Sequence, residues 1–159
     1  GFDFFPAWSV STACGATSGT AALYYGLDAG LMTPGCSYLM NFMGFTMPSS
    51  GTAHSPVITL PPDQGYHATM KLMASISAAP AVDSFTISVK PAGGAPVVLL
   101  TKADITTGAS WKDVSLDLGP WAGQQIQLSF FFDDLGNTTP GGTGVLVDDL
   151  SFTADCNPD

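Results

Sequence analysis

The chain contains no arginine and no glutamate, and this absence limits its secondary structure more than any other feature. Its 13 acidic residues are all aspartate, and its four basic residues are all lysine. Arginine and glutamate favour helices, whereas aspartate favours caps and turns. The 18 glycines and 12 prolines restrict helix formation further. The Ser, Thr, Val, Phe and Tyr residues that remain favour strands and turns, so we expect an all-β fold.

Short runs in which apolar and polar residues alternate predict the positions of the strands. The clearest run is 68–76, where Ala68, Met70 and Leu72 lie on one face of the expected strand. Similar runs predict further strands at 21–25, 37–42, 52–60, 84–90, 97–100, 114–118, 126–132 and 146–152. About nine to eleven strands are expected in all, which is enough for two packed antiparallel sheets. We predict a single β-sandwich domain over residues 1–159.

The charge of the chain argues against several classes of partner. Its net charge is −9, and nucleic-acid binding requires lysine and arginine to neutralise phosphates. Anionic membrane surfaces are disfavoured for the same reason, and no apolar run reaches the roughly 20 residues that span a bilayer. The chain begins at Gly1, so we expect a mature secreted product or an excerpt. The acidic bias and the low lysine content favour an extracellular location.

Three cysteines allow one disulfide and leave one sulfur over. Cys14 and Cys36 flank one strand-and-loop unit and are the natural pair. Cys156 is then a free thiol, an intermolecular bridge, or the partner of a segment missing here. The alternative is that all three cysteines are buried without bonds. The spacing of the cysteines does not match a zinc site.

Several short motifs follow one another in an order that resembles a known class of modules. They are Phe2-Asp3-Phe4, Pro6-Ala7-Trp8, Ala22–Gly26, Ser55–Pro61, Asp83–Val89, Trp111–Leu118, Trp121-Ala122-Gly123-Gln124 and Gly144–Leu150. This series resembles the MAM-like jelly-roll modules of secreted bacterial proteins, among them the cleaved-adhesin modules of gingipains. The resemblance covers nearly the whole chain. It implies a galactose-binding-like antiparallel jelly roll without a catalytic centre, and a role in adhesion, carbohydrate binding or substrate docking.

Calcium is the cofactor that the resemblance and the aspartates together suggest. Calcium takes six to eight oxygen ligands, and carboxylates are among those it prefers. Adjacent strand residues face opposite sides, so one of Asp148 and Asp149 is expected to face inward or toward a sheet end. A charge placed there requires a partner or a metal. The resemblance implies that Asp3 joins this site. The alternative is that Asp148 is exposed and Asp149 caps a neighbouring loop.

Asp133 and Asp134 form a second candidate for calcium, because they precede a glycine in an oxygen-rich loop. The loop lacks the spacing and the terminal glutamate of an EF-hand, which favours an Asx-rich turn instead.

Aromatic residues are the candidates for a sugar-binding platform. Tyr24 and Tyr25 are adjacent, so one of them is expected to face outward, and Tyr38 is a third candidate. Catalysis has little support, since His54 and His67 are the only histidines and no nucleophile elbow or zinc-protease motif accompanies them. We therefore expect a protein that is not an enzyme.

These observations predict a non-catalytic, calcium-stabilised extracellular module that mediates adhesion through a glycan or a cell-surface protein. The alternative is a self-assembling subunit of an extracellular filament or surface layer, whose partners are copies of itself. Apolar segments at 1–5, 39–47 and 130–132 motivate this alternative, because exposed apolar surface marks interfaces and open sheet edges accept strands.

Overall fold

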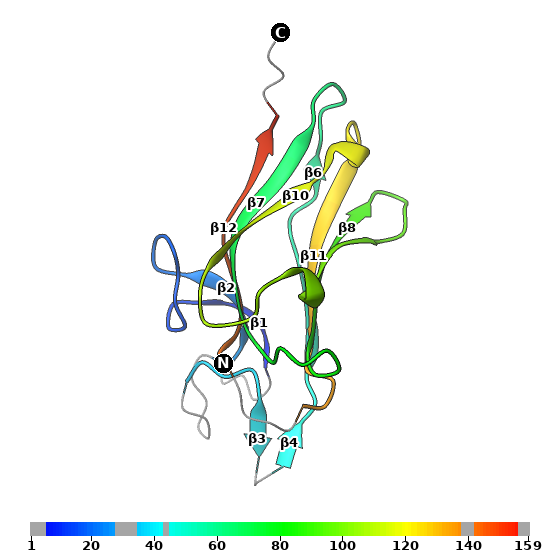
Figure 1. The fold of residues 1–159 in the computed structure, drawn as a ribbon. Coiled ribbons are helices and arrows are strands. Elements are labelled where there is room, and N and C mark those ends of the chain that lie inside the picture. Colours follow the sequence, from blue (N-terminus) through cyan, green and yellow to red (C-terminus); the bar gives the residue numbers. More distant parts are fainter. Residues whose placement is uncertain (1–5, 28–34, 43–44, 138–141, 156–159) are drawn as a thin grey trace.

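The computed structural model describes residues 6–27, 35–42, 45–137 and 142–155, and every structural statement below concerns these residues. They form two antiparallel sheets that pack face to face (Figure 1). This arrangement confirms the predicted two-sheet antiparallel jelly-roll β-sandwich. No helix in the described part of the chain is long and apolar enough to cross a membrane.

The first sheet has the strand order β1-β2-β12-β7-β10, and its members are β1 (Ala7–Ser11), β2 (Ala22–Gly26), β12 (Gly144–Ala154), β7 (Tyr66–Ser75) and β10 (Lys112–Asp117). The second sheet has the order β5-β11-β8-β9, with β6 also paired to β11; its members are β5 (Ser50–His54), β11 (Gln125–Asp133), β8 (Ser84–Pro91), β9 (Val97–Thr101) and β6 (Ile58–Thr59). The remaining elements are the hairpin of β3 (Met40–Phe42) and β4 (Phe45–Met47), and the short 3-10 helices η1 (Lys102–Asp104) and η2 (Gly119–Trp121).

The core lies between the two sheets and follows the alternation of the sequence. Phe85, Ile87 and Val89 of β8 point inward, while the polar residues between them face outward. On β11, Phe130 and Phe132 are buried in the same core. Both strands thus place every second residue in the core, as period-two alternation requires.

Two strand predictions differ from the structure. The run predicted as one strand over 52–60 is divided into β5 and β6, and Pro56 lies in the gap between them. Proline lacks the backbone N–H that a continuous ladder needs. The buried Ser55 before it exchanges hydrogen bonds with Leu128, so the chain stays attached to β11 at this break. The strand predicted over 37–42 begins only at Met40.

A second, smaller apolar cluster covers the outer face of the first sheet. Tyr24 and Leu146 are buried there beneath Cys14 and Trp111. The disulfide between Cys14 and Cys36, whose Cα atoms lie 5.4 Å apart, is the pairing that the sequence predicted. The loop that carries Cys14 therefore closes over a sheet face that would otherwise be open to solvent. The prediction for Cys156 lies outside the described residues.

Candidate functional site

The structure contradicts the prediction of a tyrosine platform, because the side chains of Tyr24, Tyr25 and Tyr38 are all 0% exposed. Tyr24 and Tyr25 do face opposite sides of β2, but both sides are covered. Tyr25 packs against Phe132 with the ring centroids 4.6 Å apart. Burial, together with the nearby charges of the Asp134 and Asp133 carboxylates, raises the pKa of Tyr25 to about 12.

Asp148 and Asp149 lie on the same side of the sheet and not on opposite sides. Val145 and Val147 point into the main core before the pair, and Leu150 packs against that core after it. The alternation therefore shifts by one residue at a β-bulge, where the register of β12 against β7 breaks between Asp148 and Ser151. Asp149 adopts a φ of +52°, the left-handed conformation that aspartate tolerates better than most residues. The prediction that the two carboxylates point to opposite faces of the strand is therefore wrong, and neither of them points into the main core.

Both carboxylates accept hydrogen bonds from the loop that precedes β2. Oδ2 of Asp148 accepts from the backbone N–H groups of Thr17 and Ser18, at 2.7 and 3.1 Å. Its Oδ1 accepts from the N–H of Asp149 at 2.8 Å. The hydroxyl of Thr17 lies 2.9 Å from Oδ2 of each aspartate, and the hydroxyl of Ser18 donates to Asp149. The alternative named Asp149 as the cap of a neighbouring loop, but Asp148 is the residue that accepts from the loop's backbone N–H groups, while Asp149 accepts only from its hydroxyls.

These contacts do not fit a calcium ion at Asp148. Backbone N–H groups donate to both of its carboxylate oxygens. A calcium ion would have to bind the same oxygen lone pairs, and the N–H groups would repel it. The described residues also contain no group of three or more metal-ligating side chains of His, Cys, Asp or Glu. Asp3 lies outside the described residues. Calcium binding accordingly stays a prediction that rests on the resemblance.

The donors around Asp148 predict a measurable dependence of stability on pH. Partial burial opposes the effect, but the hydrogen bonds from Ser18, Thr17 and Asp149 outweigh it and lower the pKa of Asp148. A carboxyl group with a lowered folded-state pKa stabilises the fold above its unfolded pKa of about 3.9, and this contribution disappears as the pH falls through the folded value. We expect Asp148→Asn to melt at a lower temperature at pH 7 and to lose less stability on acidification than the wild type.

Thermal melting between pH 7 and pH 2 measures this difference. Asp63→Asn is the control, because Asp63 is exposed and accepts no hydrogen bond within the described part of the chain. Identical acid slopes for the wild type and Asp148→Asn would contradict the prediction.

Asp133 and Asp134 form the Asx-rich turn that the sequence favoured over a calcium loop. Oδ1 of Asp133 accepts from the N–H of Leu135, and Oδ1 of Asp134 accepts from the N–H of Gly136, both at 2.8 Å. Oδ2 of the buried Asp134 also accepts from the N–H and hydroxyl groups of Ser49. The carboxylates thus hold the β11 turn against the segment before β5.

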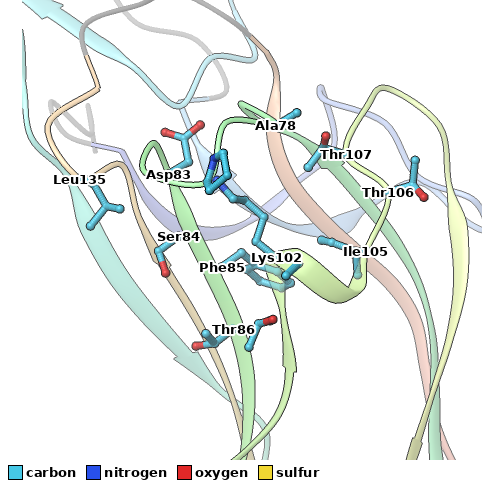
Figure 2. Close-up of a pocket in the computed structure, with 13 residues that line it drawn as sticks. Ala78, Asp83, Ser84, Phe85, Thr86, Lys102, Ile105, Thr106, Thr107 and Leu135 are labelled. Carbon is cyan, nitrogen blue, oxygen red and sulfur yellow. The ribbon is translucent and has the colours of Figure 1, made fainter.

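A pocket of about 550 Å³ opens where β8 and β9 meet η1, and the sequence pointed to none of it. Figure 2 shows Thr106 and Thr107 on one side of the pocket and Ser84 and Leu135 on the other. Five of its residues carry hydroxyl groups: Ser84, Thr86, Thr101, Thr106 and Thr107. The pocket therefore presents neutral hydrogen-bonding groups beside apolar side chains.

Lys102 fixes the loop that forms one wall of the pocket. Its ammonium group donates to the backbone carbonyls of Ser77, Ala79 and Val82, the first two at 3.3 and 2.7 Å. At the start of η1, the N–H and hydroxyl groups of Thr101 donate to the Asp104 carboxylate and lower its pKa. Among the described residues that line the pocket, Lys102 alone has a cationic side chain, and it is engaged with the protein itself.

A buried network lies behind the same wall. Oδ2 of Asp83 accepts from the hydroxyl of Tyr38 at 2.8 Å and from the N–H of Ser77 at 2.7 Å. Its Oδ1 accepts from the side-chain amide of Asn137 at 3.2 Å. Burial, and then the contact with Asp83, raises the pKa of Tyr38 far above its ordinary value. Tyr38 is thus a structural support for the pocket and not a ligand platform.

The fold is similar to two solved structures. The carbohydrate-binding module TmCBM61, solved in complex with beta-1,4-galactotriose, has a TM-score of 0.53 and 16% identity over 97% of this chain and 92% of that chain. The enzymatically active domain of bacteriophage CBA120 tailspike protein 4 has a TM-score of 0.50 and 10% identity, over 96% of this chain and 18% of that chain. No family model and no curated protein matches the chain. At such identities the similarity shows the jelly-roll sandwich, and the MAM-like family stays a prediction.

Proposed function

We propose that the protein is a non-catalytic carbohydrate-binding module and that the pocket beside β8 and η1 receives the sugar. The observation that carries the proposal is the lining of that pocket, where five hydroxyl side chains surround apolar groups such as Ile105 and Leu135. A hydroxyl both donates and accepts hydrogen bonds, as sugar hydroxyls do. Ligand pockets combine a few placed polar groups with apolar walls in this way, and the volume of about 550 Å³ lies within their usual range.

The other described features support binding in place of catalysis. His54 pairs with Ser129 on the second sheet, while His67 pairs with Asp155 on the first, so the two histidines serve different surfaces. The Asp83 carboxylate in the pocket lining is 1% exposed and accepts three hydrogen bonds from the protein. The structural neighbour TmCBM61 is a carbohydrate-binding module. The disulfide supports an extracellular location, because disulfides persist in oxidising compartments.

Affinity electrophoresis in gels that contain soluble neutral polysaccharides tests the proposal, with galactan, galactomannan and xyloglucan as the probes. The matched variant is Thr106→Val/Thr107→Val, which removes two pocket hydroxyls at nearly constant volume. Neither hydroxyl makes a hydrogen bond within the described residues, so the fold is expected to be preserved. Two lost hydrogen bonds at about 0.5–1.5 kcal/mol each predict binding that is weaker by a factor of roughly 5 to 150. Retention by none of the three polysaccharides would contradict the proposal.

Calcium is a separate proposal, because the ligand that the resemblance adds, Asp3, lies outside the described residues. Thermal melting with EDTA and then with added calcium chloride tests it. A cation that binds only the folded state raises the melting temperature as its free concentration increases. A melting temperature that is the same in EDTA and in calcium chloride would show that calcium does not stabilise the fold.

Self-assembly is the second candidate function, and exposed apolar side chains on two elements favour it. Phe45 on β4 is 74% exposed, and β9 forms one edge of the second sheet, where its Val98 is 54% exposed. An apolar edge strand of this kind can pair with a strand from another copy. Size-exclusion chromatography at increasing protein concentration separates the two functions, because only self-assembly predicts particles larger than the monomer.

A further inference from the structure

The outer face of the second sheet carries a regular array of hydroxyl side chains around one aromatic ring. The alternation that buries Phe130 and Phe132 turns Phe131 outward, onto the face opposite the core. Phe131 is partly exposed and belongs to neither apolar cluster of the described residues. It is an aromatic side chain on a sheet face that is mostly polar apart from Val98, and the packing of the sandwich does not require it there.

The strand register aligns the hydroxyl residues in rows that cross the sheet. One row runs from β9 to β5 and consists of Thr101, Thr86, Phe131 and Thr52, because these residues are direct partners in neighbouring strands. The next row consists of Val98, Ser88, Ser129 and His54. Neighbouring strands lie about 4.8 Å apart, so the first row extends over about 14 Å between its outer backbones.

Several of these hydroxyls are free to bind a ligand. Those of Thr52, Thr86 and Ser88 make no hydrogen bond with any other described residue. Ser129 is held by Nδ1 of His54 at 2.9 Å, which leaves its remaining hydrogen-bonding capacity directed outward. The rigid sheet therefore holds these hydroxyl groups in fixed positions and leaves them hydrogen-bonding capacity for a ligand.

The array continues into the pocket proposed above. Ser84, Thr86 and Thr101 line the pocket, and all three project from the strands of this face. A molecule that occupies the pocket can therefore extend along the row toward Phe131 without leaving the surface. Because the pocket and the array are continuous, we expect the ligand to be a chain of several sugar units and not a single small molecule.

The charges on and around this face favour an uncharged polysaccharide as the ligand. At the ends of the array stand Lys90 on β8 and Asp133 on β11, one of each sign. The rest of the molecule is strongly acidic, with a net charge of −9 for the whole chain, so an anionic polysaccharide would be repelled. Hydroxyl rows match a ligand that is itself rich in hydroxyl groups, and a flat aromatic ring offers an apolar surface to the C–H face of a sugar.

We infer that the outer face of the second sheet, centred on Phe131, binds the continuation of a neutral, extended polysaccharide whose first sugars occupy the pocket. The inference rests on the proposed function and adds to it a ligand class and a second binding region. It predicts that affinity increases with the length of the ligand, because only a longer chain reaches from the pocket to Phe131.

Isothermal titration calorimetry with β-1,4-linked galactooligosaccharides of increasing length and with galactan, galactomannan and xyloglucan tests this inference. In the wild type, affinity for the matching polysaccharide is expected to exceed affinity for a trisaccharide. Phe131→Ala is expected to weaken polysaccharide binding by about tenfold and to leave trisaccharide binding unchanged, since large aromatic side chains dominate such contacts. Thr52→Val/Ser88→Val removes two free hydroxyls from the face and is expected to act in the same direction.

Phe45→Ala is the matched control, because it removes an aromatic ring that is 74% exposed on the β3–β4 hairpin. It is expected to bind every ligand as the wild type does. Melting curves identify any variant that does not fold. If Phe131→Ala does not fold, Thr52→Val/Ser88→Val tests the inference in its place.

Two results would overturn the inference and are distinguishable from each other. If the pocket variant Thr106→Val/Thr107→Val loses binding while the Phe131 and Thr52/Ser88 variants do not, the proposed function stands and the extended face is rejected. If the wild type binds none of these saccharides, both the proposed function and the inference are rejected.

Discussion

Removal of the disulfide is expected to lower the free energy of unfolding by about 3 kcal/mol. Cys14 and Cys36 are separated by 22 residues, and a link across a loop of that length restricts the unfolded chain considerably. The folded state loses support as well. Cys14 lies over the outer apolar cluster, so freeing its loop exposes Tyr24 and Leu146 to water. For a chain of this size, the change corresponds to a decrease in melting temperature of roughly 6–12 °C.

Urea unfolding of the wild type and of Cys14→Ser/Cys36→Ser measures this effect. Leu146→Ala provides a comparison, because it weakens the same outer cluster but leaves the disulfide intact. If the cluster depends on the disulfide, the variant that combines Leu146→Ala with Cys14→Ser/Cys36→Ser is expected to lose less stability than the sum of the losses measured for the two changes separately. An unfolding midpoint that does not change when the disulfide is removed would contradict the prediction.

The sandwich was predictable because its signal is repeated along the chain. In β8 and β11 the alternation buries every second residue. Each strand with this pattern independently indicates a sheet with one buried face. The order of strands within the sheets is a different matter. It places β12 between β2 and β7 in the first sheet, and nothing in the local patterns of these strands specifies such long-range pairing.

The site was less predictable, because its errors came from a bulge and from a covering loop, and the alternation within one strand reports neither. One extra residue at the bulge turns Asp149 to the side of Asp148, and alternation alone places them apart. One of Tyr24 and Tyr25 was expected outside because β2 has two faces, but Trp111 and the loop of Cys14, which the disulfide to Cys36 holds, cover the second face. Phe131 had a readable signal, since three consecutive phenylalanines in a strand require at least one to face outward.

The pocket was missed because its residues carry no motif. Its hydroxyl groups come from β8, β9 and the segment after η1, and Ser and Thr residues are common along the whole chain. Only the register of β8 against β9, which sets Thr86 beside Thr101, gathers them at one place. Spacing along the sequence therefore holds little information about a site built across strands.

Asp83→Ala is expected to destabilise the fold by about 3 kcal/mol or more, because it removes the buried carboxylate to which three groups of the protein donate. These donors are the Tyr38 hydroxyl, the Ser77 N–H and the Asn137 side-chain amide. Asp83 is 1% exposed, so water cannot replace the lost carboxylate without opening the structure. Its φ of +56° adds to the cost, since alanine adopts this conformation less readily than aspartate or asparagine.

Two conservative variants separate these causes. Asp83→Asn keeps the shape, one acceptor oxygen and the tolerance for positive φ, so it is expected to lose less stability than Asp83→Ala. Tyr38→Phe removes one of the donors to Asp83 and a second acceptor of the Asn137 amide, whose bond to Asp83 remains, and about 1 kcal/mol is expected. Urea unfolding ranks the three variants. Equal losses for Tyr38→Phe and Asp83→Ala would mean that the network is not centred on the carboxylate. Because Asp83 also lines the pocket, the same ranking is expected for saccharide affinity if that wall shapes the binding site.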